Sequence, residues 1–78
     1  MSLEDVMPAQ GRIRIRANGT DYETAFCSSL ENFLTERGLM LRRVVVERNG
    51  EALSPQEAKD VILCDRDRLE IVKIVAGG

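Results

Sequence analysis

The sequence predicts an α+β domain in which a mixed sheet of four to five strands packs on one long helix and a short second helix. Three observations support this fold class: short segments of alternating or β-branched residues, two Asn-Gly pairs suited to tight turns, and a stretch of apolar residues at helical spacing. A chain of 78 residues has the length of one small domain. Such a domain leaves little room for an enclosed catalytic cavity.

The predicted sheet begins at residues 12–16, where arginine and isoleucine alternate. This alternation places Ile13 and Ile15 on one face of a strand and Arg12, Arg14 and Arg16 on the other. Asn18-Gly19 is the preferred pair for a type I′ turn, so a second short strand should return over residues 20–22.

The long helix is predicted over residues 23–37, with Gly38 placed to end it in a left-handed conformation. Its apolar stripe consists of Phe26, Leu30, Phe33 and Leu34. Cys27 lies at the edge of this stripe, and we expect both Cys27 and Cys64 to be reduced and buried. A thiol that reacts with a partner is the alternative. The cysteines show no metal-ligand spacing and the chain has no histidine, so no metal site is predicted.

The second half of the chain alternates strands with short polar segments. Ser54-Pro55-Gln56-Glu57 forms a capping-box pattern that predicts a short helix before Cys64. Asp65 and Asp67 are expected to cap local amides in a turn rather than to bind a metal. The remaining strands, separated by these segments and by the Asn49-Gly50 turn, are predicted over residues 43–48, 51–53 and 69–75.

This order of strands and helices is the β-grasp pattern. The first and last strands should run parallel and adjacent at the centre of the sheet, joined by a crossover through the helix. The domain is expected to span residues 12–78, preceded by a flexible N-terminal extension over 1–11 and ending in a flexible tail at 76–78.

The terminal Ala76-Gly77-Gly78 follows the last predicted strand directly and suggests chemistry at the main chain. A terminal carboxylate is ionised at neutral pH and resists nucleophiles until another enzyme attaches a leaving group such as AMP. Glycine has no β-carbon, so it fits a narrow channel and leaves both faces of the carbonyl open. A frayed, glycine-rich end is the alternative interpretation.

Composition excludes several classes of partner. The formal net charge is −2, and basic and acidic residues are mixed along the chain, so neither nucleic acid nor a membrane is an expected partner. The arginines of residues 12–16 lack interleaved aromatic residues and are interpreted as a solvated face. Without an apolar run of membrane length or a secretory signal pattern, the chain is expected in the cytoplasm.

The element order, the segments 45–50 and 65–67 and the final Ile71–Gly78 together resemble the ThiS-like sulfur-carrier proteins, a ubiquitin-like β-grasp family with a C-terminal Gly-Gly. The resemblance covers residues 12–78. Molybdopterin-synthase small subunits share the fold and the diglycine, but they typically carry paired prolines near the end, where this chain has Lys73-Ile74-Val75.

The resemblance implies a carrier for thiazole formation in thiamin biosynthesis. An ATP-dependent, ThiF-like adenylating enzyme would activate the Gly78 carboxylate, and a persulfide sulfur donor would convert it to a thiocarboxylate, 1-thioglycine. A ThiG-like thiazole synthase would then take the sulfur. The chain would be a cosubstrate without catalytic residues or bound cofactor, and a monomer when free. A carrier for molybdopterin or another pathway, a ubiquitin-like modifier of target lysines and a plain interaction module remain alternatives.

The last strand also predicts a docking surface. Leu69 and Ile71 should face the helix, which leaves Glu70, Val72 and Ile74 on the opposite face of the sheet. Glu70 could form an ion pair with one of the arginines on the first strand. The apolar residues Val72 and Ile74, next to the tail, suggest a partner-binding patch. Val45 on the neighbouring strand is expected to belong to the same patch. Scattered exposed aliphatic residues are the alternative.

Overall fold

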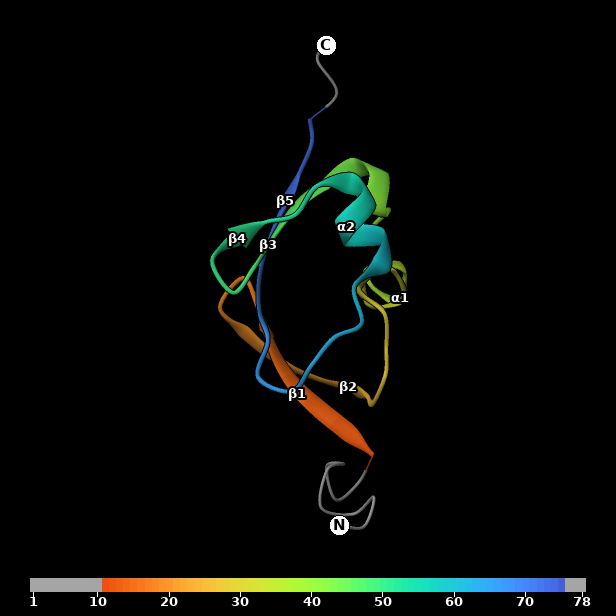
Figure 1. The fold of residues 1–78 in the computed structure, drawn as a ribbon, viewed down its shortest axis with the longest axis vertical. Coiled ribbons are helices and arrows are strands. Elements are labelled where there is room, and N and C mark those ends of the chain that lie inside the picture. Colours follow the sequence, from red (N-terminus) through yellow and green to blue (C-terminus); the bar gives the residue numbers. More distant parts are fainter. Residues whose placement is uncertain (1–10, 76–78) are drawn as a thin grey trace.

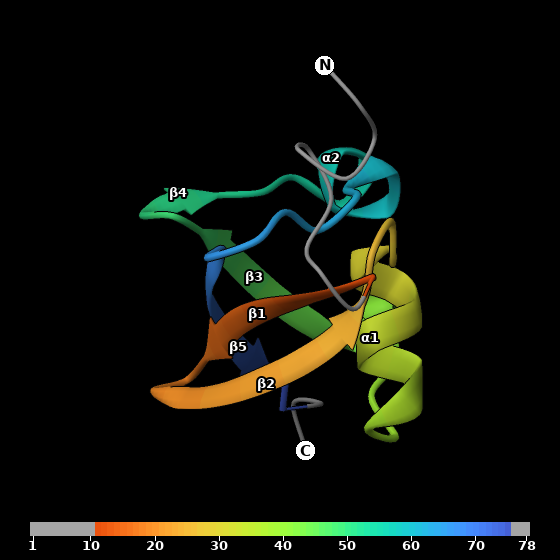
Figure 2. The same cartoon turned by 90° about the horizontal axis from the view of Figure 1, so that it is seen from below.

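The computed structural model describes residues 11–75, so the predicted extension at 1–11, except for its last residue, and the predicted tail at 76–78 lie outside the described residues. The described part forms a five-stranded sheet with strand order β2-β1-β5-β3-β4, and its helices lie on one face of this sheet (Figures 1 and 2). The elements in chain order are β1 (Arg12–Ala17), β2 (Thr20–Ala25), α1 (Leu30–Glu36), η2 (Leu41–Arg43), β3 (Val44–Arg48), β4 (Glu51–Ala52), α2 (Pro55–Asp60) and β5 (Arg68–Lys73).

The sheet has the mixed topology that the sequence predicts. β1 and β5 are parallel neighbours, with Arg16 opposite Arg68 and Ala17 opposite Leu69. β5 pairs antiparallel with β3 on its other side, and β1 pairs antiparallel with β2. The α+β class and the central position of the first and last strands are therefore confirmed.

The prediction of one long helix is wrong. β2 continues to Ala25, and α1 has only seven residues because it begins at Leu30. Thr24 points into the core and is 7% exposed, so the inward alternation that starts at Tyr22 continues past the predicted helix start. Cys27 has a positive φ of 69°, which no helix accommodates. Ser29 then caps α1 by accepting a hydrogen bond from the Asn32 amide at 3.0 Å.

The predicted burial of the cysteines is wrong as well. Both Cys27 and Cys64 are exposed. Because α1 starts late, Phe26 and Cys27 belong to the turn before the helix, and Phe26 is 40% exposed. Cys64 lies in the segment before β5, where its Sγ is 3.4 Å from Arg48 Nη2.

The core lies between the sheet and the helices. Phe33 packs edge-on against Tyr22, with ring centroids 5.4 Å apart, and the Arg37 guanidinium covers both rings. The side chains with the least exposure are Ile15, Leu30, Phe33, Leu34 and Leu69. Gly38, with φ of 74°, ends α1 as predicted.

With one exception, the polar segments around α2 behave as the sequence predicts. Ser54 and Glu57 form a reciprocal capping box, in which the Ser54 amide donates to Glu57 Oε1 at 2.8 Å. These hydrogen bonds from Ser54 lower the pKa of Glu57. Asp67 is buried, and its Oδ2 accepts from the Cys64 amide at 2.8 Å and from Arg48 Nε at 3.0 Å. Asp67 thus caps a local amide as predicted, whereas Asp65 accepts from the amide of Arg14 on β1, far away in sequence, rather than from a local amide.

The asparagines of both Asn-Gly turns hold β5 in place. Asn18 Nδ2 donates to the Ile71 carbonyl at 2.9 Å, and Asn18 Oδ1 accepts from the Ile71 amide at 2.7 Å. On the other side of β5, Asn49 Oδ1 accepts from the Arg68 amide at 2.8 Å. Both asparagines have positive φ, so the turn conformation aims their side chains at β5. Each side chain thereby extends the ladder of a neighbouring strand.

Replacing Asn18 with glycine should destabilise the fold while keeping the turn conformation. Glycine accepts the positive φ, but both side-chain hydrogen bonds to Ile71 are lost, which we expect to cost about 1–2 kcal/mol. Thermal unfolding measures this loss. Asn18→Asp keeps the hydrogen-bond acceptor but not the donor, and its free energy of unfolding should fall by about half as much. Equal stability of Asn18→Gly and the wild type would show that the turn alone positions β5.

Candidate functional site

The chain leaves the sheet directly after β5. The strand is predicted to reach residue 75, but the ladder ends at Lys73, after which the Ile74 amide donates to the Arg43 carbonyl at 2.8 Å. Val75 is 86% exposed. Figure 1 shows the segment after β5 leading away from the sheet and the helices. The predicted reactive residues Ala76, Gly77 and Gly78 lie outside the described residues.

The predicted apolar patch residues are exposed and lie close together. Val45 on β3 is directly opposite Val72 on β5, and they are 48% and 62% exposed. Ile74, two residues beyond Val72, is 54% exposed. Leu69 is buried and Ile71 packs against the core, so the predicted alternation along β5 is confirmed. We call the helix-free side of the sheet, which carries Val45 and Val72, the open face.

Two further exposed apolar side chains near the start of the tail, those of Val75 and Met40, are not part of the patch that the sequence predicts. Val75 is predicted to lie in the last strand, but it follows the end of β5 and adds an exposed apolar side chain just beyond Ile74. Met40 is 46% exposed and lines a small open hollow of about 310 Å³ together with Lys73 and Ile74. Met40 lies in the connection between α1 and η2, and no periodic signal in the sequence links that connection to β5.

The arginines of β1 occupy the other half of the open face. Arg16 Nε is 2.9 Å from Asp21 Oδ1, and this hydrogen bond and charge lower the pKa of Asp21. Arg12 and Arg14 each lie 4.0 Å from a carboxylate oxygen of Glu23. The arginines therefore pair with acids of β2, and no ion pair to Glu70 is found among the described residues. The two acids of β2 thus offset part of the charge of these three arginines.

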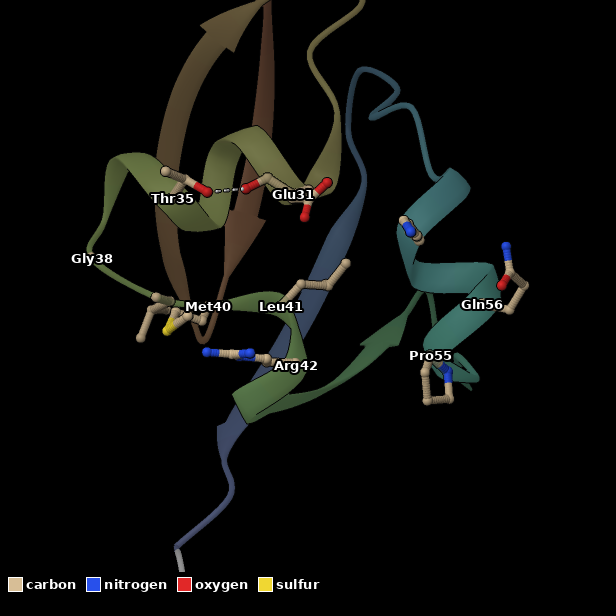
Figure 3. A pocket seen from close by; sticks show the side chains of 10 residues that line it. Glu31, Thr35, Gly38, Met40, Leu41, Arg42, Pro55 and Gln56 are labelled. Carbon is tan, nitrogen blue, oxygen red and sulfur yellow. Dashed lines mark hydrogen bonds between the residues drawn. The ribbon is translucent and has the colours of Figure 1, made fainter.

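A cleft of about 810 Å³ lies on the helical side, between α1, η2 and α2 (Figure 3). It is lined in part by Glu31, Thr35, Arg42 and Lys59. Thr35 Oγ1 donates to the Glu31 carbonyl at 2.9 Å, so the only hydroxyl of this lining is engaged with its own helix. The lining contains no cysteine, serine or histidine that could form a nucleophile–base pair. The cleft is open and lies on the side of the sheet away from Val45 and Val72.

The arrangement of side chains and the length of the helices in residues 11–75 bear on metal and membrane binding. Within this part of the chain, no group of three or more histidine, cysteine, aspartate or glutamate side chains is arranged to hold a metal ion. None of the helices that the structure describes is long and apolar enough to cross a membrane.

Comparison with known proteins identifies the family. The ThiS family model matches residues 15–78, which include both glycines at the end. The chain belongs to the ThiS family. It is 35% identical over 65 residues to the sulfur carrier protein ThiS of Bacillus subtilis, a match that covers 82% of this chain and 98% of that protein. The resemblance stated from the sequence is thereby confirmed.

This ThiS family member is also similar to part of a larger enzyme. A thiazole synthase of Paramagnetospirillum magneticum is 33% identical over 66 residues, which are 85% of this chain but only 20% of that protein. About a fifth of that thiazole synthase is therefore similar to this chain.

Proposed function

We propose that this chain is the sulfur carrier of thiazole formation in thiamin biosynthesis, and that Gly78 carries the sulfur as a thiocarboxylate. The observation that carries the proposal is membership of the ThiS family over residues 15–78. The similarity to the Bacillus subtilis sulfur carrier spans nearly all of that protein, and the similarity to a thiazole synthase agrees with the thiamin pathway.

The chemistry requires activation by another enzyme. A carboxylate is a poor electrophile, so a ThiF-like adenylating enzyme would let the Gly78 carboxylate attack the α-phosphate of ATP, with release of pyrophosphate. A persulfide sulfur then attacks the acyl-adenylate and AMP leaves; reductive cleavage of the resulting acyl disulfide by a thiol gives the 1-thioglycine anion. No side chain of the carrier acts as acid or base. The chain is a cosubstrate rather than an enzyme, and it needs no bound cofactor.

The fold supports this role by fixing the base of the tail. β5 is hydrogen-bonded on both sides, and the Ile74 amide is still held by Arg43. From Val75 to Gly78 the chain can span about 13 Å when extended, at about 3.3 Å per residue. This length would carry the terminal carboxylate from the domain into a narrow partner site. Cytoplasmic location and a monomeric free state stay predictions.

The apolar patch beside the tail is the proposed docking surface. Val45, Val72 and Ile74 are exposed next to the start of the tail, and neither the core nor the helices use them. The adenylating enzyme and the thiazole synthase would both cover this patch, because each must receive the same terminus. The carrier would therefore bind them in turn.

Incubation with an adenylating enzyme, ATP and a sulfur donor tests the function by intact-mass spectrometry. We expect a mass gain equal to one oxygen replaced by one sulfur, located at Gly78. Covalent conjugates to other proteins would instead indicate a ubiquitin-like modifier. An unchanged mass with a competent adenylating enzyme from the same organism would contradict the carrier role.

Tail variants should separate activation from folding. Deleting Gly78, or the change Gly77→Val, should lower ATP–pyrophosphate exchange by about 100-fold or more, since the carboxylate is displaced or the channel obstructed. Both changes lie beyond the end of β5, so thermal unfolding should not change. Ala76→Gly keeps the tail length and adds no side chain, and should retain exchange. Normal exchange with Gly77→Val would count against the proposed narrow channel.

The double change Val72→Ser and Ile74→Ser should weaken binding to the adenylating enzyme more than it affects stability. Loss of two apolar contacts should raise the Kd by about tenfold or more, as measured by calorimetry. The melting temperature should change little, because both side chains are largely exposed. Ile62→Ser is a matched control, since Ile62 is 52% exposed but lies off the patch. Equal losses of binding and stability would identify Val72 and Ile74 as structural residues.

A further inference from the structure

The two Asn-Gly turns present the same reactive dipeptide to water. An asparagine followed by glycine can lose its side-chain amide: the glycine nitrogen gives up its proton and attacks Cγ, the bond from Cγ to Nδ2 breaks, and ammonia leaves. Water then opens the cyclic imide to aspartate or isoaspartate. Glycine favours ring closure because it has no side chain to obstruct it. Asn18-Gly19 and Asn49-Gly50 are both exposed, and all four residues have positive φ, so the chain carries two copies of this motif in similar backbone conformations.

The side-chain amide of Asn18 is held by the main chain of β5. Its Nδ2 donates to the Ile71 carbonyl at 2.9 Å, and its Oδ1 accepts from the Ile71 amide at 2.7 Å. Ring closure makes Cγ tetrahedral and expels Nδ2, so the planar amide must first leave these two partners. Deamidation of Asn18 therefore requires the turn to separate from Ile71, and the native state opens in this way only for a fraction of the time.

The amide of Asn49 is held by a buried network instead. Its Nδ2 donates to Asp67 Oδ1 at 3.0 Å, and its Oδ1 accepts from the Arg68 amide at 2.8 Å. Asp67 is only 4% exposed, and its Oδ2 forms an ion pair with Arg48 at 2.9 Å. Separation of Asn49 from Asp67 takes a hydrogen bond from a buried charge, which costs more than the loss of bonds to exposed main-chain groups. Asn49 should therefore open less often than Asn18.

The attachment of Asn18 lies at the weak end of the β1–β5 pairing. The last residues that pair between these strands are Ala17 and Leu69. Ile71 lies two residues further along β5, where the Asn18 side chain takes the place of a strand residue. The end of a short ladder opens at a lower free energy than its interior. Asn18 is thus the asparagine whose reacting amide is released first.

We propose that Asn18 is a deamidation site whose reaction is controlled by local separation of β5 from the Asn18 turn, and that the contact with Asp67 protects Asn49. This inference goes beyond the proposed function and does not depend on it. An aspartate at position 18 keeps the acceptor for the Ile71 amide, but it places a carboxylate oxygen against the Ile71 carbonyl. Isoaspartate lengthens the main chain of a two-residue turn. Either product weakens the attachment of β5, the strand that leads into the tail.

Incubation of the wild-type chain in mildly alkaline buffer, followed by digestion and mass spectrometry, tests the inference. Free peptides of residues 14–23 and 45–54 give the rates of the two dipeptides without the fold, and these rates should be similar. In the folded chain, Asn18 should react about tenfold more slowly than in its peptide, and Asn49 about tenfold more slowly again. Reaction of Asn18 as fast as in its peptide, or of Asn49 as fast as Asn18, would overturn the inference.

Hydrogen exchange measures the same opening independently. Because the Ile71 amide donates to Asn18 Oδ1, the factor by which the fold slows exchange of this amide should equal the factor by which it slows deamidation of Asn18. Deamidation that is slowed far less than exchange would show that the Asn18 side chain leaves without separation of β5, and would contradict the proposed control.

A pair of matched variants distinguishes local opening from unfolding of the whole domain. Ile71→Ala removes apolar contact with the core next to the Asn18 turn, and it should speed deamidation of Asn18 about tenfold while changing the rate at Asn49 much less. Ile62→Ala shortens an exposed isoleucine away from this turn and should change neither rate. Equal acceleration at both asparagines in Ile71→Ala would show that global unfolding controls the reaction, and would overturn the inference.

Discussion

The position of β5 depends on hydrogen bonds from both of its neighbours and from two turn asparagines. β1 and β5 share only a short register, with Arg16 opposite Arg68 and Ala17 opposite Leu69. Asn18 extends this pairing by two further bonds to Ile71, and Asn49 secures Arg68 on the other side. Without these bonds the strand that carries the patch and the base of the tail would have a much weaker attachment along β1.

The two faces of the sheet carry different kinds of side chains. The face beneath the helices buries the core residues Ile13, Ile15, Val46 and Leu69. The open face carries side chains that the core does not use, and on β3 and β5 these are Val45, Glu47, Arg68, Glu70 and Val72. Because successive residues of a strand point to opposite faces, the same few positions specify both the fold and the proposed docking surface.

The sequence predicted the parts of the fold that depend on strong local signals. The Asn-Gly turns, the capping box at Ser54 and the alternation in β1 and β5 each have one structural interpretation, and the structure confirms them. The prediction of one long helix is wrong because Phe26 fits the helical spacing of Leu30 and Phe33. Two other signals were stronger: Ser29 is the better N-cap, and Thr24 continues the alternation of β2. The exposure of Cys27 follows from that same error. The patch of Val45, Val72 and Ile74 follows from the alternation along two strands, but the pairing of Glu47 with Glu70 needs the β3–β5 register, which no local pattern contains.

The parallel arrangement of β1 and β5 has a mechanical consequence. An enzyme that drew the terminus into a channel, as proposed above, would pull β5 along its own axis. Hydrogen bonds between strands run across that axis, so such a load is shared by the bonds to β1, to β3 and to the asparagine side chains at the same time. A load of this kind shears many bonds together instead of peeling them one after another, and the domain can resist traction on its terminus without coming apart.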